Sequence, residues 1–266
     1  DIDARSLFRL PSPSLTPANL VEVARVIGEG FASGFDGAVV IQGTDTIEES
    51  AFLLDLLVDS DQPVVVTGAM RGADAPGADG PANLLAAAIV AASPESRGLG
   101  TLAVLNYDIH AARFVQKSHT ALPSAFLSPL VGSIGTLIER QPRFYVRVKR
   151  NPNLSAAEGP PAPVALVKVA MGDDGRLLGA LPGLGYAGVV IEGMGAGHVL
   201  ADVAPLVGDL AAKIPVVLAS RAMTRVPQIL VNGTLKSRKP LDQLPKTTRA
   251  IAAAERVDVL GREPRS

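Results

Sequence analysis

The chain contains no cysteine and no tryptophan, and only 4% of its 266 residues are aromatic. Without cysteine, disulfide bonds, thiolate nucleophiles and cysteine-ligated metal sites are excluded. The shortage of aromatic side chains argues against a stacking platform for single-stranded nucleic acid. The three histidines, at positions 110, 119 and 198, are widely separated in sequence, which argues against a histidine-built zinc site. The chemistry must therefore rely on hydroxyl, carboxylate and amine groups, and we expect no metal and no cofactor.

A strong net charge and a long apolar run are also missing. The formal net charge is −1, so the chain lacks the basic field typical of a nucleic-acid binder. No apolar run reaches about 18 residues without a charge or a turn former, so we expect no membrane span. The first residues show no signal-peptide pattern. The compartment stays unknown, with the cytoplasm as the favoured expectation. In contrast, the 47% hydrophobic content is enough to build a substantial core.

Strand and helix patterns alternate along the first half of the chain. Short apolar runs typical of buried parallel strands occur at 37–42, 63–67 and 101–106. Helical spacing of apolar residues occurs at 17–32, 47–58 and 79–92. This alternation predicts a parallel sheet with right-handed crossovers, in which ligands bind outside the carboxyl ends of the strands. The segments that follow strands, at 43–46, 67–80 and 106–119, are therefore the candidate site segments.

Composition divides the chain into two parts. Residues 149–163 are rich in proline and polar residues and lack apolar periodicity, as is typical of a linker. We therefore expect an α/β protein with a larger domain over 1–148, holding a mostly parallel sheet flanked by helices, and a smaller α/β domain over 164–266. From residue 222 onward there are nine Lys and Arg against four Asp and Glu. This basic tail is either a solvated surface or, less often, a partner-binding arm.

Polar residues follow the first predicted strand directly, as Gly43-Thr44-Asp45-Thr46. Gly43 lets the backbone turn sharply and approach a ligand closely. Thr44 and Asp45 would then project into the crevice, in front of helix amides that favour anionic groups. A simpler interpretation is that Asp45 or Thr46 only caps the following helix.

This segment has a recognisable pattern. Residues Val40–Glu49, reading VIQGTDTIEE, resemble the signature of bacterial L-asparaginases and glutaminase-asparaginases. Further blocks resemble the same family in the same order, namely VTGAMR at 66–71, ADGPANL at 78–84, VQK at 115–117 and GMGAGH at 193–198. The likeness runs from about residue 9 to residue 221.

The resemblance implies hydrolysis of L-asparagine to L-aspartate and ammonia in two acyl-transfer halves. In the family a first threonine, within an N-terminal Thr-Gly-Gly-Thr-type block, attacks the side-chain amide. A second group of threonine, aspartate and lysine helps to activate the nucleophile or the hydrolytic water. Carried over by position, this second group is Thr44, Asp45 and Lys117.

These side chains suit the chemistry. A hydroxyl is a poor nucleophile at neutral pH unless a nearby base takes its proton. A lysine can be that base only where burial favours the neutral amine. On its own, Lys117 would be read as a solvated surface lysine. Its register with the other blocks instead predicts a desolvated amine beside Thr44.

The resemblance also implies how a free amino acid is bound. Asp45 would accept the α-ammonium group, and Ser12 resembles the serine that holds the α-carboxylate. Pro13 stands where the family has a glutamine, which removes one contact. His198 stands where well-studied members have an asparagine that reaches a neighbouring subunit's site; the alternative is an ordinary, partly buried histidine.

Two departures leave alternatives open. The block with the nucleophilic threonine is expected before residue 1, and the family's closing Lys-Ala-Arg helix has no counterpart in 222–266. Either the sequence is an incomplete record of an asparaginase, or it is a catalytically impaired form that binds an amino acid. A nucleotide site is a weaker reading, because the glycines at 193–197 do not match the dinucleotide fingerprint.

The family also sets the expected partners. Its members pair so that the small domain of one subunit completes the crevice of the other. We therefore expect a homodimer or homotetramer that binds L-asparagine or L-glutamine, with no nucleic-acid and no membrane partner.

Overall fold

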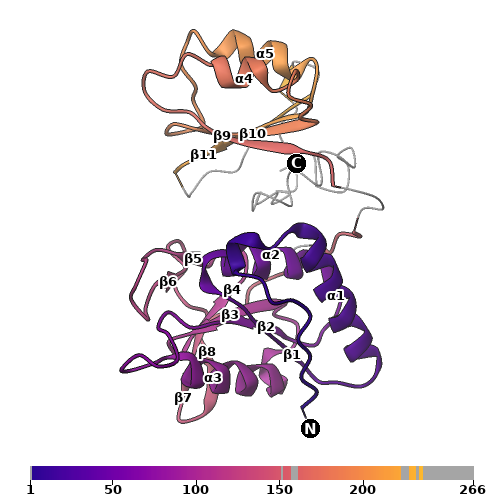
Figure 1. The fold of residues 1–266 in the computed structure, drawn as a ribbon, viewed down its shortest axis with the longest axis vertical. Helices are drawn as coiled ribbons and strands as arrows, with labels where there is room; N and C mark the ends of the chain where they lie inside the picture. Colours follow the sequence, from indigo (N-terminus) through magenta and orange to yellow (C-terminus); the bar gives the residue numbers. More distant parts are fainter. Residues whose placement is uncertain (1, 151, 157–160, 223–227, 232–233, 236–266) are drawn as a thin grey trace, which may run out of the picture. The chain divides into compact units, whose positions relative to one another are not determined.

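A computed structural model describes residues 2–150, 152–156, 161–222, 228–231 and 234–235 (Figure 1). The chain divides into two compact units, Asp1–Ala156 and Ala157–Ser266. Most of the basic tail predicted from residue 222 lies outside the described residues. Within the described part of the chain, no helix combines the length and apolarity needed to cross a bilayer.

The large unit contains a six-stranded sheet in the order β1-β2-β3-β4-β7-β8. Its strands are β1 (Ala38–Ile41), β2 (Val64–Thr67), β3 (Thr101–Leu105), β4 (Asp108–Ala111), β7 (Gly135–Ile138) and β8 (Gln141–Phe144). Strands β1, β2 and β3 pair in parallel, with Ala38 opposite Val64 and Val64 opposite Thr101. The α/β class and the parallel pairing of the three predicted strands are confirmed.

The other half of this sheet is antiparallel, so the sheet is mixed rather than mostly parallel. After β3 the chain reverses at Asn106 and Tyr107, whose φ angles are 51° and 64°. Two consecutive positive φ angles are typical of a tight hairpin turn, which joins antiparallel strands only. Glu139 and Arg140 form a second such turn between β7 and β8, with φ angles of 49° and 62°.

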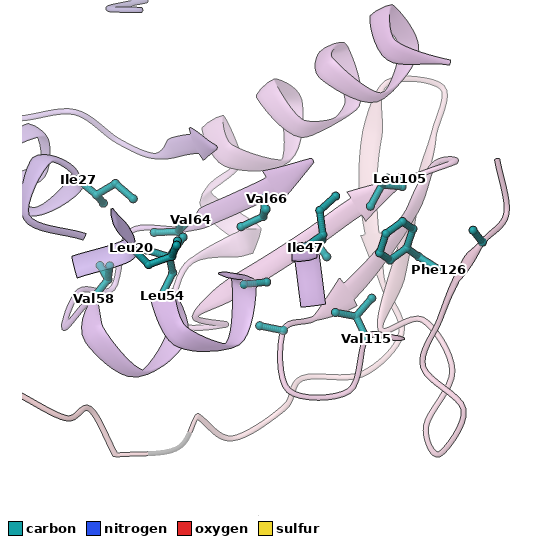
Figure 2. Close-up of a cluster of buried hydrophobic side chains, with 14 residues drawn as sticks. Leu20, Ile27, Ile47, Leu54, Val58, Val64, Val66, Leu105, Val115 and Phe126 are labelled. Carbon is teal, nitrogen blue, oxygen red and sulfur yellow. The ribbon is translucent and has the colours of Figure 1, made fainter. Parts of the chain in front are cut away.

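Helices cover both faces of the sheet. Figure 1 shows α1 (Pro17–Ala32) and α2 (Ile47–Leu57) on one face and α3 (Gly80–Ala92) on the other. Alternate residues of β2 face opposite sides, because Val64 and Val66 pack with α1 and α2 whereas Val65 packs with α3. Figure 2 shows the first of these clusters. Burying such an aliphatic side chain stabilises the fold by about 1.5–3 kcal/mol, so this packing fixes α2 on the sheet.

Helix α1 begins and ends where the sequence predicts. Thr16 and Asn19 form a capping box, in which each side chain accepts a hydrogen bond from the other residue's backbone N–H. At the other end Gly34 has a φ of 96°, and Phe35 N–H donates to Gly30 O. This left-handed glycine satisfies the last carbonyls of the helix.

Short elements complete the large unit around the site. Two of its three short 3-10 helices, η1 (Ser12–Ser14) and η2 (Thr44–Thr46), contact each other; the third is η3 (Pro94–Ser96). Strands β5 (Gln116–Lys117) and β6 (Phe126–Leu127) pair only with each other, as a separate two-stranded sheet.

The small unit is a second α/β layer. Its sheet has the order β13-β12-β11-β10-β9, in which β9 (Val164–Lys168), β10 (Gly188–Gly193) and β11 (Val216–Ser220) are parallel. Strands β12 (Gln228–Val231) and β13 (Thr234–Leu235) extend it in the antiparallel sense. Helices α4 (Arg176–Ala180) and α5 (Ala204–Ala211) pack on it through Leu178, Val207 and Leu210. The smaller C-terminal α/β domain is thus confirmed as a fold; its boundaries stay a prediction.

Candidate active site

The turn after β1 is held from one side by Ser12. The Ser12 hydroxyl oxygen accepts a hydrogen bond from Asp45 N–H at 3.2 Å, and Thr46 Oγ1 donates to Ser12 O at 3.1 Å. A Cβ at Gly43 would lie 2.7 Å from Ser12 Oγ. Glycine at this position leaves room for the close approach of Ser12, which helps to fix the backbone that carries Thr44 and Asp45.

The helix-capping interpretation of this turn is wrong. Thr46 occupies the N-cap position of α2 but makes no side-chain cap hydrogen bond. Its hydroxyl instead donates to Ser12 O and accepts from Gln42 Nε2 at 3.2 Å. The Asp45 side chain points to a different partner, Lys117.

Lys117 joins Thr44 and Asp45 from far along the chain. Its Nζ donates to Thr44 Oγ1 at 2.9 Å and to Asp45 Oδ1 at 2.5 Å, across 73 and 72 residues. The Lys117 side chain is 17% exposed, whereas that of Asp45 is 59% exposed. The three residues singled out from the sequence therefore form one cluster, in which the amine is largely shielded and the carboxylate faces solvent.

A cavity opens beside this cluster. Its volume is about 290 Å³, and its lining residues are Asp45, Lys117, Ser118, His119 and Thr120. This volume is near the lower end for small-molecule sites. A second cavity, of about 320 Å³, is lined by α3 and the two hairpin turns and contains none of the predicted site residues. We therefore take the cavity at Asp45 and Lys117 as the candidate site.

Sequence reasoning missed two neighbours of Lys117. Glu48 Oε2 accepts a hydrogen bond from Lys117 N–H at 2.6 Å. His119 Nδ1 accepts from Ala121 N–H at 3.0 Å and from Leu122 N–H at 3.1 Å, so a neutral His119 ring carries its proton on Nε2. Both residues lie within a few positions of a predicted site residue, which is the only signal that the sequence offered.

The remaining two predicted residues, Ser12 and His198, are not part of the Thr44–Asp45–Lys117 side-chain cluster. Ser12 is only 3% exposed, and its hydroxyl faces the Asp45 backbone. His198 belongs to the small unit, where it is exposed, so the alternative of a partly buried histidine is wrong. Its backbone pairs with that of Met194 through two hydrogen bonds of 2.8 Å. The substrate-binding roles of Ser12 and His198 stay predictions.

The loop after β2 is fixed by a polar network around Asp79 and the buried Asn83. The Asp79 carboxylate accepts hydrogen bonds from Met70 N–H and Arg71 N–H, each at 2.9 Å, and from Asn83 Nδ2 at 3.0 Å. Burial raises the pKa of Asp79, but these hydrogen bonds outweigh it and hold the pKa below its ordinary value. Asn83 also donates to Gly68 O and accepts from Asn106 N–H, which ties together the ends of β2 and β3.

In the described ranges, no group of three His, Asp or Glu side chains is arranged to hold a metal ion. The chemical groups gathered at the site are instead an amine, a hydroxyl and a carboxylate. Such a set can exchange protons with a hydroxyl nucleophile and bind a small cation.

Two family models match the chain. The model described as "Asparaginase, N-terminal" matches residues 1–150, and "Glutaminase/Asparaginase C-terminal domain" matches residues 163–235. Together they span both units, including the segments that carry Thr44, Lys117 and His198.

Individual relatives agree with the family models. The chain is 39% identical over 228 residues to a probable L-asparaginase of Deinococcus radiodurans, covering 80% of this chain and 66% of that protein. It is 36% identical over 199 residues to an L-asparaginase of Bacillus licheniformis, covering 74% and 62%. A glutaminase-asparaginase of Acinetobacter glutaminasificans is 34% identical over 189 residues, covering 68% and 56%. The chain thus spans less than two thirds of the length of each of these relatives.

A solved structure shows the same fold. The crystal structure of a probable cytoplasmic L-asparaginase from Campylobacter jejuni superposes with a TM-score of 0.79 at 32% identity, covering 84% of this chain and 71% of that one. Both the sequence blocks and the fold agree with the family models, and the chain belongs to the asparaginase family.

Proposed function

We propose that the protein hydrolyses the side-chain amide of L-asparagine to L-aspartate and ammonia, and that Thr44, Asp45 and Lys117 carry the proton transfers. The observation that supports this best is the position of Lys117 Nζ, 2.9 Å from Thr44 Oγ1 and 2.5 Å from Asp45 Oδ1. This is the distance at which an amine can exchange a proton with a hydroxyl.

The reaction then has two halves. A hydroxyl oxygen attacks the amide carbon while its proton passes to the Lys117 amine, which must be unprotonated for this step, and the C–N bond breaks as the nitrogen leaves as ammonia with that proton. Water next attacks the resulting ester, gives its proton to the same amine, and releases aspartate and the free hydroxyl. Thr44 acts either as the attacking group or as the relay that activates another hydroxyl or the water. Lys117 serves as base in both versions.

Asp45 suits a second task, recognition of the substrate's α-ammonium group. One of its oxygens accepts from Lys117, but the side chain remains 59% exposed at the edge of the cavity. A carboxylate in this position pairs with a cation of a small ligand. Ser12 would act on the α-carboxylate, and His198 would act from a neighbouring subunit of a homodimer or homotetramer.

The names of the relatives favour hydrolysis over binding alone. The matched proteins are called asparaginases, and one is called a glutaminase-asparaginase. The choice between the two amides is therefore part of the test.

The test is an ammonia-release assay with L-asparagine and L-glutamine, on purified protein whose intact mass has been measured. We expect release from L-asparagine, with one equivalent of L-aspartate formed. Binding of L-aspartate without ammonia release would contradict the proposal and favour an impaired, amino-acid-binding form. Release of ammonia from neither amide, with no binding of either, would remove the asparaginase assignment for this site.

A further inference from the structure

We propose that Glu48 is a positioning residue for the amide-hydrolysis reaction, because it holds the backbone of Lys117 and so sets where the Lys117 amine lies. This inference rests on the proposed function for its kinetic consequence. Its structural part, the control of Lys117 by Glu48, stands on the geometry alone.

The contact is direct and crosses the fold. Glu48 Oε2 accepts the backbone N–H of Lys117 at 2.6 Å, over 69 residues of sequence. Glu48 lies in the first turn of α2, immediately after the η2 turn that carries Thr44 and Asp45. A hydrogen bond to an ionised carboxylate is roughly twice as strong as a neutral one.

Lys117 needs such an anchor because its strand is not part of the main sheet. Strand β5 has two residues and pairs only with β6, through Gln116 opposite Leu127 and Lys117 opposite Phe126. In an antiparallel pair, alternate N–H groups point away from the partner strand. The Lys117 N–H donates in this outward direction, to α2.

Packing supplies a second contact between β5 and α2. Val115 is fully buried and belongs to the same hydrophobic cluster as Ile47 and Phe126 (Figure 2). Apolar packing of this kind is not directional. It keeps Val115 buried, but it does not by itself set where the neighbouring backbone N–H groups point. Beside the β5–β6 pairing, the bond to Glu48 is the directional restraint that ties the Lys117 backbone to α2.

One short stretch of chain therefore contacts Lys117 at both ends. Thr44 and Asp45 bind the Nζ, and Glu48 binds the backbone nitrogen. Lysine has a long side chain with many rotamers, so its amine is placed well only if its backbone is placed well. A shift of about 1 Å in a reacting group can cost about 100-fold in rate.

The experiment compares Glu48→Ala with Glu48→Gln, which keeps an oxygen able to accept the Lys117 N–H. Glu49→Ala is the matched control, because it removes the neighbouring, exposed carboxylate from the same helical turn. For Glu48→Ala we expect kcat to fall about 100-fold while KM changes less than about 3-fold. Glu48→Gln should recover most of kcat, and Glu49→Ala should lose far less of kcat than Glu48→Ala.

A second readout does not depend on activity. Amide hydrogen exchange at Lys117, measured by NMR, should be slow in the unmodified protein and in Glu48→Gln, and at least about 10-fold faster in Glu48→Ala. If the unmodified protein hydrolyses neither amide, the proposed function fails, and this comparison alone decides whether Glu48 holds Lys117.

Two results would overturn the inference. One is a kcat for Glu48→Ala equal to that of Glu49→Ala. The other is an unchanged exchange rate at Lys117 in Glu48→Ala, which would show that packing alone holds β5. Glu48→Asp, whose carboxylate is one methylene shorter, replaces Glu48→Ala if the latter does not fold.

Discussion

Each unit contains a turn at the carboxyl end of a parallel strand, and the two turns differ in their hydrogen bonds. In the large unit, the segment 43–46 follows β1; in the small unit, the segment 193–198 follows β10. Each begins with a glycine at the carboxyl end of a parallel strand, where α/β proteins bind ligands. The sequence pattern predicts 43–46 as a candidate site segment, and the family resemblance adds 193–198 through His198.

Their hydrogen bonds differ in the groups that they hold. The first turn is bound by Ser12 and Lys117, which lie tens of residues away in sequence. The second turn is bound through its backbone. Met194 pairs with His198, and the distant Ser220 Oγ and Arg221 N–H donate to Gly195 O and Gly193 O. Side chains held by distant segments have a preorganised geometry, whereas hydrogen bonds to a turn's backbone fix the turn and not its side chains. The comparison supports the proposal that the proton-transfer chemistry lies in the large unit.

The largest expected effect comes from removing the amine of the large-unit turn. Lys117→Met keeps the length of the side chain but cannot exchange a proton with Thr44. We expect ammonia release to fall by about 10²–10⁴-fold, the usual range for loss of a general base. The melting temperature should stay within a few degrees, because Lys117 is not part of the hydrophobic clusters of the large unit. Normal turnover in Lys117→Met would place the proton transfers elsewhere.

Acid should lower the stability of the large unit through His110. His110 is 2% exposed, and burial lowers its pKa from 6.5 to about 4. Between pH 6.5 and pH 4 the unfolded chain binds a proton at this site and the folded chain does not, so the large unit loses about 3 kcal/mol as the pH falls. His110 belongs to the large unit, so this loss is expected in that unit.

The control for this prediction is His110→Gln, because Asp55 and Asp108 also titrate in the large unit. Burial raises the pKa of both carboxyls, so their protonation adds stability as the pH falls and partly masks the effect of His110. Hydrogen exchange of individual segments, recorded during urea unfolding at each pH, would measure the stability of each unit separately. An equal acid loss in the unmodified protein and in His110→Gln would show that His110 is not the cause.

The two strand-end glycines should tolerate a methyl group differently. A Cβ at Gly193 would meet backbone atoms, with Gly197 C at 2.7 Å and His198 O at 2.9 Å. A Cβ at Gly43 would meet Ser12 Oγ, an atom that rotation can move. We expect Gly193→Ala to destabilise its unit by about 2–3 kcal/mol and Gly43→Ala by about 1 kcal/mol. Denaturant unfolding measures the two losses of stability. A larger loss for Gly43→Ala than for Gly193→Ala would contradict the contacts described above.

The smallest effect is expected from His198→Ala. The side chain of His198 is exposed, and an exposed side chain contributes less than about 0.5 kcal/mol to folding. If His198 contacts a substrate bound to a neighbouring subunit, the variant should raise KM about 5- to 10-fold and leave kcat unchanged. An unchanged KM would remove His198 from the site.

Much of the fold followed from apolar patterning. The strands β1, β2 and β3 lie in continuous apolar runs and the helices between them show apolar periodicity, and Thr16 and Gly34 mark the ends of α1. The antiparallel strands were missed because they are two to four residues long and their turns use Asn106–Tyr107 and Glu139–Arg140 instead of glycine. Nothing in those pairs signals a hairpin in the sequence.

The site was predictable only in part, for a different reason. Thr44, Asp45 and Lys117 came from the resemblance to the family, and the structure brings them together. The partnership of Glu48 with the Lys117 backbone depends on a contact across 69 residues, which no local pattern contains. The position of Ser12, buried under the turn, likewise depends on how η1 packs on η2.

The claim that Thr44 and Lys117 act as one unit is tested most directly by a double-mutant cycle on kcat for ammonia release. Thr44→Val and Lys117→Met are measured singly and together. If the two residues share one proton transfer, the double variant should be no slower than the slower single variant, because either change already removes that step. Losses that multiply would mean that Thr44 and Lys117 act independently, and would contradict the account.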